Sequence, residues 1–249
     1  MIAKEISSLQ HPLVKHWVRL RSSSTYRYRE KGLLATGENI FSELSGRLPF
    51  KRLIVQKEAS HAHSFPCEEL FLVTEDILKK ITGLVQPQPI AVELPLPHSA
   101  DLTSASRLLV LDNVSDPGNL GTLLRSALAF GWDGAFVLGK SADPFNDKAL
   151  RASKGAVFRL PLAWGDEDAF HSLLSAKKWE IFGADMKGKP LHAIAPPSPP
   201  FMLVLGNEAK GLSPFIKERS TLLSLPMAGE MESLNVAIAG SIFMHLLQR

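Results

Sequence analysis

Three polar stretches in the C-terminal half of the chain carry residue types that could do chemistry, and each directly follows an apolar run. They are DNVSDPGN (112–119), LGNEAKGLS (205–213) and SLPMAGEMESLN (224–235). In open α/β sheets, ligands bind beyond the carboxyl ends of the strands. If the apolar runs are strands, these stretches are where a binding or reaction site is expected.

Two charged side chains in these regions allow two interpretations each. Arg125 falls just outside the apolar arc of a helix expected over 120–130, which Asn119 is placed to cap. Its guanidinium could contact a phosphate or a reacting hydroxyl, or form an ordinary surface salt bridge. Glu208 stands between Gly206 and Gly211 directly after a buried run. It could be the solvated acid of a tight connection or part of a ligand cradle.

Serines are placed to start two further helices. Ser213 followed by Pro214 fits a cap and first helical residue. Ser233 is a natural N-cap for the last helix, whose free amides would suit a carboxylate or phosphate. Capping alone explains Ser233 but does not explain Asn235, a poor helix former expected in the first turn.

The second half of the chain alternates strand and helix signals. Strands are expected in the runs 107–114, 134–139, 179–186, 201–206 and 222–226, and helices over 119–130, 166–178 and the last residues. This alternation predicts a mostly parallel sheet covered by helices. Earlier, apolar runs at 51–56 and 70–74 with a helix over 75–84 indicate a small α/β unit. Four prolines in 86–97, around an extended stretch, indicate a domain boundary.

The composition is that of a soluble globular protein. The chain is 45% hydrophobic and 21% charged, and no apolar run approaches the roughly 18 residues that a membrane span needs. The first residues lack a signal-peptide core, and the single Cys67, read as structural, cannot form an internal disulfide. We therefore expect a cytoplasmic protein with no membrane partner.

Basic residues are concentrated near the N-terminus. Residues 1–52 hold ten Lys and Arg against four Asp and Glu, although the whole chain is only +3. Between Lys15 and Lys31 the basic residues are interleaved with Trp17, Tyr26 and Tyr28, a pattern suited to phosphates and stacked bases. An ordinary solvated helix followed by a loop fits the same pattern. The candidate RNA-binding residues are Arg19, Arg21, Arg27, Arg29 and Lys31.

Together, the three polar stretches resemble the ordered motifs of the SpoU (TrmH-like) branch of the SPOUT RNA methyltransferases. The first family motif, N-x-x-D-P-x-N-x-G-x-x-x-R-x-A-x-x-F-G, is matched at every fixed position from Asn113 to Gly131. The second resembles LGNEAKGL (205–212), where Ala209 replaces a usual glycine. The third resembles LPMAGEMESLNVA (225–237), and KALRASKGAVFRLP (148–161) resembles the family's linking segment.

The resemblance implies a fold and an assembly. The domain over 104–249 would be an α/β sheet with flanking helices whose end is threaded into a deep trefoil knot. The enzyme would be a homodimer through this knotted domain. Residues 1–98 more loosely resemble a small α/β substrate-binding domain for RNA.

It also implies an activity, in which a methyl group passes from S-adenosylmethionine to a ribose 2′-hydroxyl of RNA. Arg125 would activate the hydroxyl, Asn119 and Glu208 would position it, and Ser233 and Asn235 would hold the ribose-phosphate and the cofactor end. The cofactor would be held around Leu205, Gly206, Leu225, Met227 and Leu234. No metal is expected, and the HAH sequence at 61–63 is interpreted as a loop rather than a ligand set.

Other classes of protein fit less well. No G-x-G-x-x-G follows a strand, and no G-x-x-x-x-G-K-[ST] occurs, so nicotinamide-dependent oxidoreductases and P-loop enzymes are set aside. Ribosomal RNA is the first expectation for the substrate and transfer RNA the second. A non-catalytic RNA-binding or ribosome assembly factor is the alternative from another class.

Overall fold

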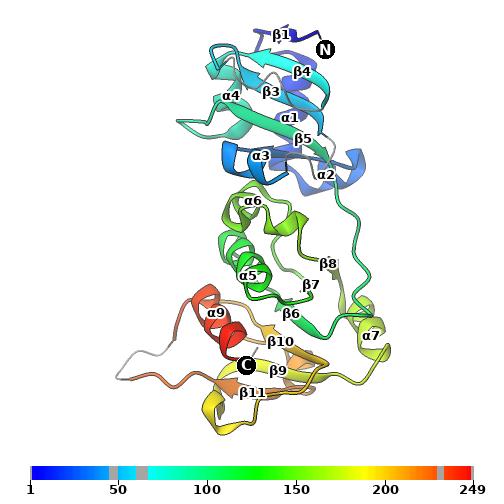
Figure 1. Cartoon of the computed structure of the whole chain (residues 1–249), viewed down its shortest axis with the longest axis vertical. Coiled ribbons are helices and arrows are strands. Elements are labelled where there is room, and N and C mark those ends of the chain that lie inside the picture. Colours follow the sequence, from blue (N-terminus) through cyan, green and yellow to red (C-terminus); the bar gives the residue numbers. More distant parts are fainter. Residues whose placement is uncertain (1, 45–49, 60–66, 229–232, 248–249) are drawn as a thin grey trace. The chain divides into compact units, whose positions relative to one another are not determined.

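The computed structural model describes residues 2–44, 50–59, 67–228 and 233–247. The chain divides into two compact units (Figure 1). The N-terminal unit comprises Met1–His98 with Phe145–Gly155, and the C-terminal unit comprises Ser99–Pro144 with Ala156–Arg249. Residues 61–63, where the histidine pair occurs, lie outside the described residues.

The C-terminal unit is built on a six-stranded sheet in which every neighbouring pair of strands is parallel. The strand order is β11-β9-β10-β6-β7-β8. The strands are β6 (Arg107–Asp112), β7 (Gly134–Leu138), β8 (Leu162–Gly165), β9 (Glu180–Pro190), β10 (Phe201–Leu205) and β11 (Thr221–Ser224). The predicted mostly parallel α/β sheet is therefore confirmed for this unit.

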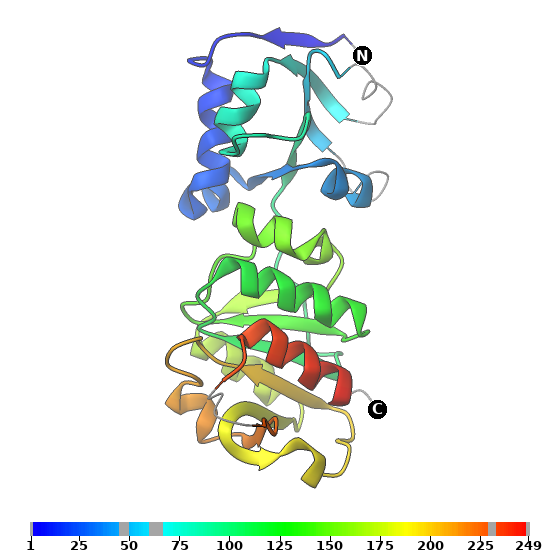
Figure 2. The same cartoon turned by 90° about the vertical axis from the view of Figure 1, so that its left-hand side faces the viewer.

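Helices cover this sheet, which explains its continuous apolar strands. The helices are α5 (Pro117–Ala129), α7 (Glu167–Ser175), α8 (Pro214–Lys217) and α9 (Val236–Leu247). Helices α5 and α9 lie side by side (Figure 2) and are joined by a hydrogen bond of 2.8 Å between the hydroxyls of Ser126 and Ser241. Alternate residues such as Leu108 and Val110 pack into the core cluster that includes Phe170 of α7.

The order in which the chain adds strands to the sheet changes direction between the neighbouring strands β6 and β10. From β6 the chain moves outward through β7 and β8, and it then crosses to the other side of β6, where β10 and β9 lie. Strands β6 and β10 are adjacent, with Leu111 paired to Leu205. Such a switch point opens a crevice at the carboxyl ends of the strands, and this positions the site.

The N-terminal unit contains a mixed five-stranded sheet of order β1-β4-β3-β5-β2. Its strands are β1 (Lys4–Ile6), β2 (Gly32–Thr36), β3 (Phe50–Gln56), β4 (Cys67–Val73) and β5 (Ile90–Pro95). Its helices are α1 (Pro12–Ser22), α2 (Ser24–Glu30), α3 (Glu38–Leu44), α4 (Glu75–Thr82) and α6 (Asp147–Ser153). The interpretation of 86–97 as a domain boundary is wrong in its central part, because β5 pairs on both sides within this sheet.

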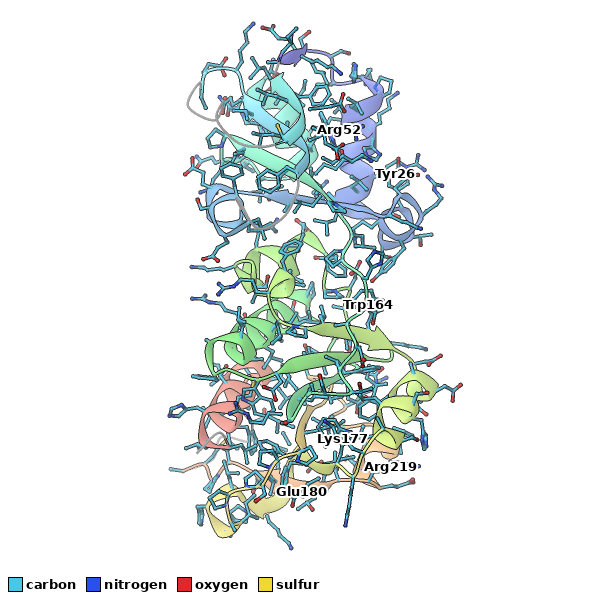
Figure 3. The ribbon with its side chains drawn as sticks, turned by 45° about the vertical axis from the view of Figure 1, so that its right-hand side comes forward. Tyr26, Arg52, Trp164, Lys177, Glu180 and Arg219 are labelled. Atoms are coloured by element: carbon cyan, nitrogen blue, oxygen red, sulfur yellow. The ribbon has the colours of Figure 1, made fainter. Side chains whose placement is uncertain are left out.

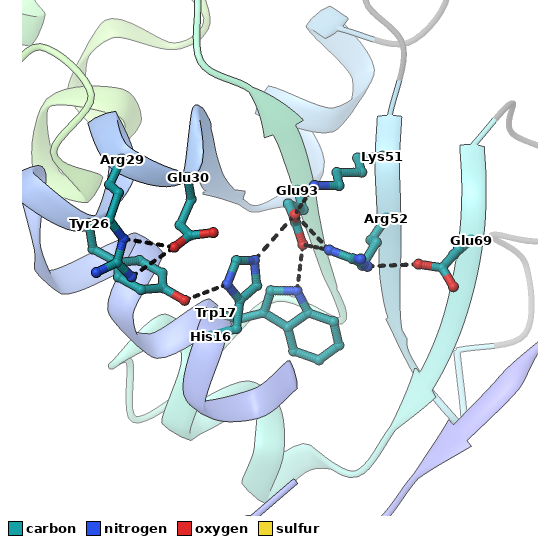
Figure 4. A network of polar contacts seen from close by, with 9 residues as sticks. All are labelled: His16, Trp17, Tyr26, Arg29, Glu30, Lys51, Arg52, Glu69 and Glu93. Atoms are coloured by element: carbon teal, nitrogen blue, oxygen red, sulfur yellow. Dashed lines mark hydrogen bonds and ion pairs between the residues drawn. The ribbon is translucent and has the colours of Figure 1, made fainter. Parts of the chain in front are cut away.

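One buried acid organises the polar interior of the N-terminal unit (Figure 4). Glu93 of β5 is only 1% exposed. Its carboxylate accepts hydrogen bonds from Arg52 at 2.8 Å and from the Trp17 indole at 2.9 Å, and His16 Nε2 lies 3.3 Å away. Burial alone would raise the pKa of Glu93, but these hydrogen bonds outweigh it and lower the pKa to about 2.

Removing the guanidinium partner should destabilise the N-terminal unit strongly. Arg52→Met leaves the buried carboxylate of Glu93 without its main cation, and such a break costs about 3–5 kcal/mol. Because the pKa of Glu93 is lowered on folding, its contribution is complete above the unfolded value. It is lost as the pH falls from about 5 toward 2.

Urea unfolding at pH 7 and pH 3 tests this contribution. The wild type should lose stability at pH 3, and Glu93→Gln should lose less over the same interval. Lys57→Met, which removes an exposed ion pair with Glu5, is the control and should unfold like the wild type. Equal pH dependence in the wild type and Glu93→Gln would contradict the assigned role.

Candidate functional site

The loops after β6 and β10 are joined by a buried carboxylate. Asp112, the last residue of β6, is fully buried. It accepts a hydrogen bond of 2.6 Å from the Ser213 amide and one of 2.7 Å from the side chain of Asn113. Asn113 takes a left-handed φ of 57°, and its carbonyl accepts from Asn207. These bonds fix where both loops leave the sheet.

Glu208 forms the second link between the two loops. Its carboxylate accepts from the backbone amides of Ser115 and Asp116, both at 3.1 Å, from the Ser115 hydroxyl at 2.9 Å, and from the Asn119 side-chain amide at 3.0 Å. Glu208 is exposed, as the acid of a tight connection would be, but its carboxylate is also held by these donors. The acid closes the loop after β10 onto the first turn of α5.

This arrangement fixes the charge of Glu208. Burial on its own would raise the pKa of the carboxyl, but the hydrogen bonds from Asn119, Ser115 and Asp116 lower it to about 2. At neutral pH the group is an anion with its lone pairs occupied by donors. It is therefore suited to positioning the loop and poorly suited to accepting a proton.

The turn that carries Glu208 is held by its own backbone and by one side chain. Asn207 and Gly211 exchange two backbone hydrogen bonds of 2.9 Å, and Asn207 Oδ1 accepts from the amides of Ala209 and Lys210. Gly211 takes the left-handed φ of +70°, whereas Ala209 does not have a positive φ. Replacement of a family glycine by Ala209 is therefore accommodated without backbone strain.

The caps of the two helices at the site differ from the sequence expectation. Asp116, and not Asn119, caps α5, because Pro117 takes the first helical position and Asp116 accepts from the Asn119 amide at 2.8 Å. Asn235, and not Ser233, caps α9 by accepting from the amides of Ala237 and Ile238. Capping therefore accounts for Asn235. The expected Ser213 cap of α8 is confirmed.

Asn235 also extends the hydrogen-bonded set. Its Nδ2 donates to Asn119 Oδ1 at 3.1 Å, and Asn119 in turn donates to Glu208. The three polar stretches found in the sequence therefore meet through Glu208, Asn119 and Asn235.

A cavity of about 570 Å³ opens beside this set, within the range of small-molecule sites. It is bordered by the middle of β9, the ends of β10 and β11 and the start of α9. Its lining includes all five residues proposed for the cofactor together with three of the proposed catalytic residues: Leu205, Gly206, Leu225, Met227, Leu234, Glu208, Ser233 and Asn235. Asn119 belongs to the hydrogen-bonded set but does not line the cavity.

Arg125 stands apart from the cavity. It lies on α5, its side chain is exposed, and it is not among the residues that line the cavity. Among the residues that the structure describes, it has no hydrogen-bond or ion-pair partner. The surface salt bridge, which was the alternative interpretation of Arg125, is therefore not formed with any residue that the structure describes.

The candidate RNA-binding residues of the N-terminal unit separate into two kinds. Arg27 is 2% exposed and donates to the carbonyls of Leu20 and Arg21, so the structure makes it a support for the end of α1. Trp17 is fully buried and offers no stacking face.

Arg19, Arg29 and Lys31 are exposed, and Arg21 is half-buried. The guanidinium carbons of Arg19 and Arg29 lie 4.5 and 4.8 Å from the ring centre of Tyr26, which Figure 3 labels.

Sequence reasoning missed several residues of the site. Asp112 and Ser115 lie in the first polar stretch but were given no role, although both hold the loops together. Asp185 and Lys217, which face the cavity as an ion pair, lie in no recognised motif. The signal for Asp112 was its acidic side chain at the end of an apolar strand.

No helix among the described residues is long and apolar enough to cross a membrane. No group of three or more His, Cys, Asp or Glu in the same residues could hold a metal ion.

The chain is similar to known proteins along its whole length. It is 32% identical, over 98% of this chain and 99% of the relative, to the 23S rRNA (guanosine(2553)-2′-O)-methyltransferase RlmP of Bacillus subtilis (strain 168). The AdoMet-bound rRNA methyltransferase from Sinorhizobium meliloti is 28% identical, with a TM-score of 0.85 over 99% of this chain and 97% of that one.

A putative RNA methyltransferase of the TrmH family from Porphyromonas gingivalis is 30% identical, with a TM-score of 0.85 over 96% of this chain and 98% of that one. Residues 106–245 match the sequence profile of the SpoU rRNA Methylase family. With the three motif stretches joined at one cavity, these matches show that the chain belongs to the SpoU family of RNA methyltransferases.

Proposed function

We propose that this protein transfers a methyl group from S-adenosylmethionine to a ribose 2′-hydroxyl of ribosomal RNA. The observation that carries the proposal is the hydrogen-bonded set of Glu208, Asn119 and Asn235 beside a cavity lined by the candidate cofactor residues. The 23S rRNA activity of the Bacillus subtilis relative supports ribosomal RNA as the substrate. Action on ribosomal RNA would place the enzyme in the cytoplasm.

The cavity suits the cofactor in its chemistry. Leu205, Leu225 and Leu234 supply apolar walls for an adenine ring. The absence of a side chain at Gly206 lets the backbone of Gly211 pack against it, so the turn that carries Glu208 closes beside the cavity. When bound, the cofactor supplies an electrophilic methyl group on a sulfonium. The cofactor bound in the Sinorhizobium meliloti structure supports this assignment.

The residues of the three motifs would have separate roles in methyl transfer. A ribose hydroxyl is a weak nucleophile and gains reactivity as its proton leaves. Arg125 would orient the hydroxyl and stabilise the negative charge that develops on its oxygen, aided by a phosphate of the RNA. Glu208 and Asn119 would keep the loop after β6 in position, and Ser233 and Asn235 would contact the ribose-phosphate.

We also propose that the N-terminal unit binds RNA through Arg19, Arg29 and Lys31, and that the half-buried Arg21 lies at the edge of this RNA-binding surface. Arg19 and Arg29 are held against Tyr26, so less side-chain freedom is lost when they pair with phosphates. The burial of Arg27 removes it from this set.

Two features of α9 support the proposed assembly. It packs against α5 and β10, whereas β11, which precedes it, lies at the far edge of the sheet beyond β9. Such a return across the sheet end is what the proposed trefoil knot needs. Ile238, Ile242 and Leu246 are exposed on one face of α9 and would be covered in a homodimer.

The proposed activity is tested first by methyl transfer. Labelled S-adenosylmethionine, total RNA from cells lacking this protein and the purified enzyme should yield a single 2′-O-methylated site in ribosomal RNA. Arg125→Ala should lower transfer by at least roughly 100-fold, because a donor to the developing charge is lost. Its affinity for the cofactor by calorimetry should be unchanged, since Arg125 does not line the cavity.

Arg219→Ala, which removes another surface arginine (Figure 3), is the control and should transfer normally. A mapped site in transfer RNA would correct the substrate. No transfer together with no cofactor binding would favour the non-catalytic RNA-binding factor, and near-normal turnover of Arg125→Ala would remove its assigned role.

Glu208→Gln should lower kcat by roughly 10- to 100-fold, because the amide cannot accept all the donors and the loop shifts. The shape of the pH–rate profile between pH 5.5 and 9.5 should stay the same, since Glu208, with a pKa of about 2, does not titrate there. Loss of one limb of that profile in the variant would show instead that Glu208 accepts a proton.

The homodimer is tested by light scattering. The wild type should show twice the 27.3 kDa chain mass, and Ile242→Asp should show a single chain because a charge is placed on the apolar face. Val85→Asp, at a position 86% exposed in the N-terminal unit, should remain dimeric. A monomeric wild type would contradict the proposal.

A further inference from the structure

An ion pair lies on the cavity wall at a distance from the family motifs. Asp185 of β9 and Lys217 of α8 both line the cavity, and Asp185 Oδ2 lies 3.2 Å from Lys217 Nζ. Asp185 Oδ1 accepts a hydrogen bond of 2.9 Å from the Lys187 amide. The carboxylate is 15% exposed and the ammonium 43%, so the acid is the more enclosed partner.

These contacts leave the carboxylate able to accept more hydrogen bonds. The hydrogen bond from Lys187 and the pair with Lys217 outweigh partial burial and lower the pKa of Asp185. An ionised carboxylate has about four acceptor positions. The contacts named above use one on each oxygen, so a ligand in the cavity can reach the other two.

The charge around the pair favours a neutral donor over a cation. Lys217 already neutralises Asp185, and Lys210 adds a second ammonium to the lining, against Glu208. The α-ammonium of an amino acid would meet no excess negative charge here. Hydroxyl groups need none, and a carboxylate that accepts from ribose hydroxyls is a recurring device at strand ends of α/β sheets.

The position along the sheet agrees with this partner. Gly183 of β9 pairs with Val204 of β10, so Asp185 stands level with Gly206 but one strand farther from Asn119 than β10 is. A group bound at Asp185 therefore lies next to the part of the cavity near Asn119, where the methyl group would react, and not within that part. In an adenosine cofactor the ribose ring is one carbon from the sulfonium, so it is the part that lies beside the reacting end.

We propose that Asp185 accepts hydrogen bonds from the 2′- and 3′-hydroxyls of the cofactor's own ribose, and that Lys217 acts as a positioning residue that holds Asp185 toward the cavity. The proposal rests on the proposed function, because it assumes an adenosine cofactor in this cavity. It adds a determinant of cofactor recognition outside the three motifs.

Calorimetry on the full chain tests the proposal without relying on catalysis. Wild-type protein is titrated with S-adenosylhomocysteine, its 2′-deoxy and 3′-deoxy analogues, and 5′-methylthioadenosine, which keeps the diol but lacks the amino acid. Each deoxy analogue should bind about 10- to 100-fold more weakly than S-adenosylhomocysteine, the range expected for a lost hydrogen bond to a charged acceptor.

The variants assign that loss to Asp185. Asp185→Asn should weaken S-adenosylhomocysteine and 5′-methylthioadenosine by similar factors. It should weaken each deoxy analogue by a smaller factor, because only one hydroxyl of that analogue still reaches Asp185. Lys217→Met should weaken the ligands that carry the full diol more than the deoxy analogues, and Lys217→Arg should restore their affinity. Glu218→Gln is the matched control, because it removes an exposed carboxylate next to Lys217 that does not line the cavity.

The failures of the two proposals are distinguishable. Deoxy analogues that bind the wild type as tightly as S-adenosylhomocysteine would overturn the ribose assignment while leaving the methyltransferase proposal intact. An Asp185→Asn loss confined to S-adenosylhomocysteine, with 5′-methylthioadenosine unaffected, would overturn it in favour of the amino-acid tail. No binding of any of these ligands, together with no methyl transfer, would overturn both.

Discussion

The geometry of the site depends on one carboxylate, that of Glu208, held by donors from the loop after β6. Strands β6 and β10 are neighbours, but a parallel pairing fixes only the strands and not the loops that leave them. The amides of Ser115 and Asp116 point outward where α5 begins, and an acid from the facing loop satisfies them. Without this link, Asn119 and Asn235 would have no fixed relation to the cavity.

Asp112 and Glu208 hold the loops after β6 and β10 at two different depths. Asp112 is fully buried at the base, where it ties β6 to the Ser213 amide, and Glu208 acts at the outer rim. Between them lies a turn whose backbone bonds to itself. The loop after β10 is therefore fixed at both ends before any ligand arrives, which lowers the conformational cost of binding.

Sequence patterns located most strands of the C-terminal sheet and the three stretches that meet beside the cavity, but not how the residues of those stretches act. The apolar runs locate β6, β7, β10 and β11 because buried parallel strands are continuously apolar. Patterns did not indicate the short β2, β8 and α6. The cap of α9 was misplaced because Ser233 and Asn235 are both good caps, and only the backbone decides between them. Arg27 looked like a surface cation because local sequence cannot show that its guanidinium turns inward to two carbonyls.

The placement of the acids also limits where the proton of a ribose hydroxyl can go. Glu208 has its oxygens occupied by donors and a pKa of about 2, and Asp112 lies fully buried beneath the loops. Arg125 carries a permanent positive charge and is a poor base. Since these groups do not offer a free basic lone pair at neutral pH, the proton must pass to something that arrives with the substrate. As the oxygen bonds to the methyl group, its O–H becomes strongly acidic, so even a weakly basic phosphate beside the target ribose can accept the proton. A guanidinium with no partner in the described chain can hold that phosphate there.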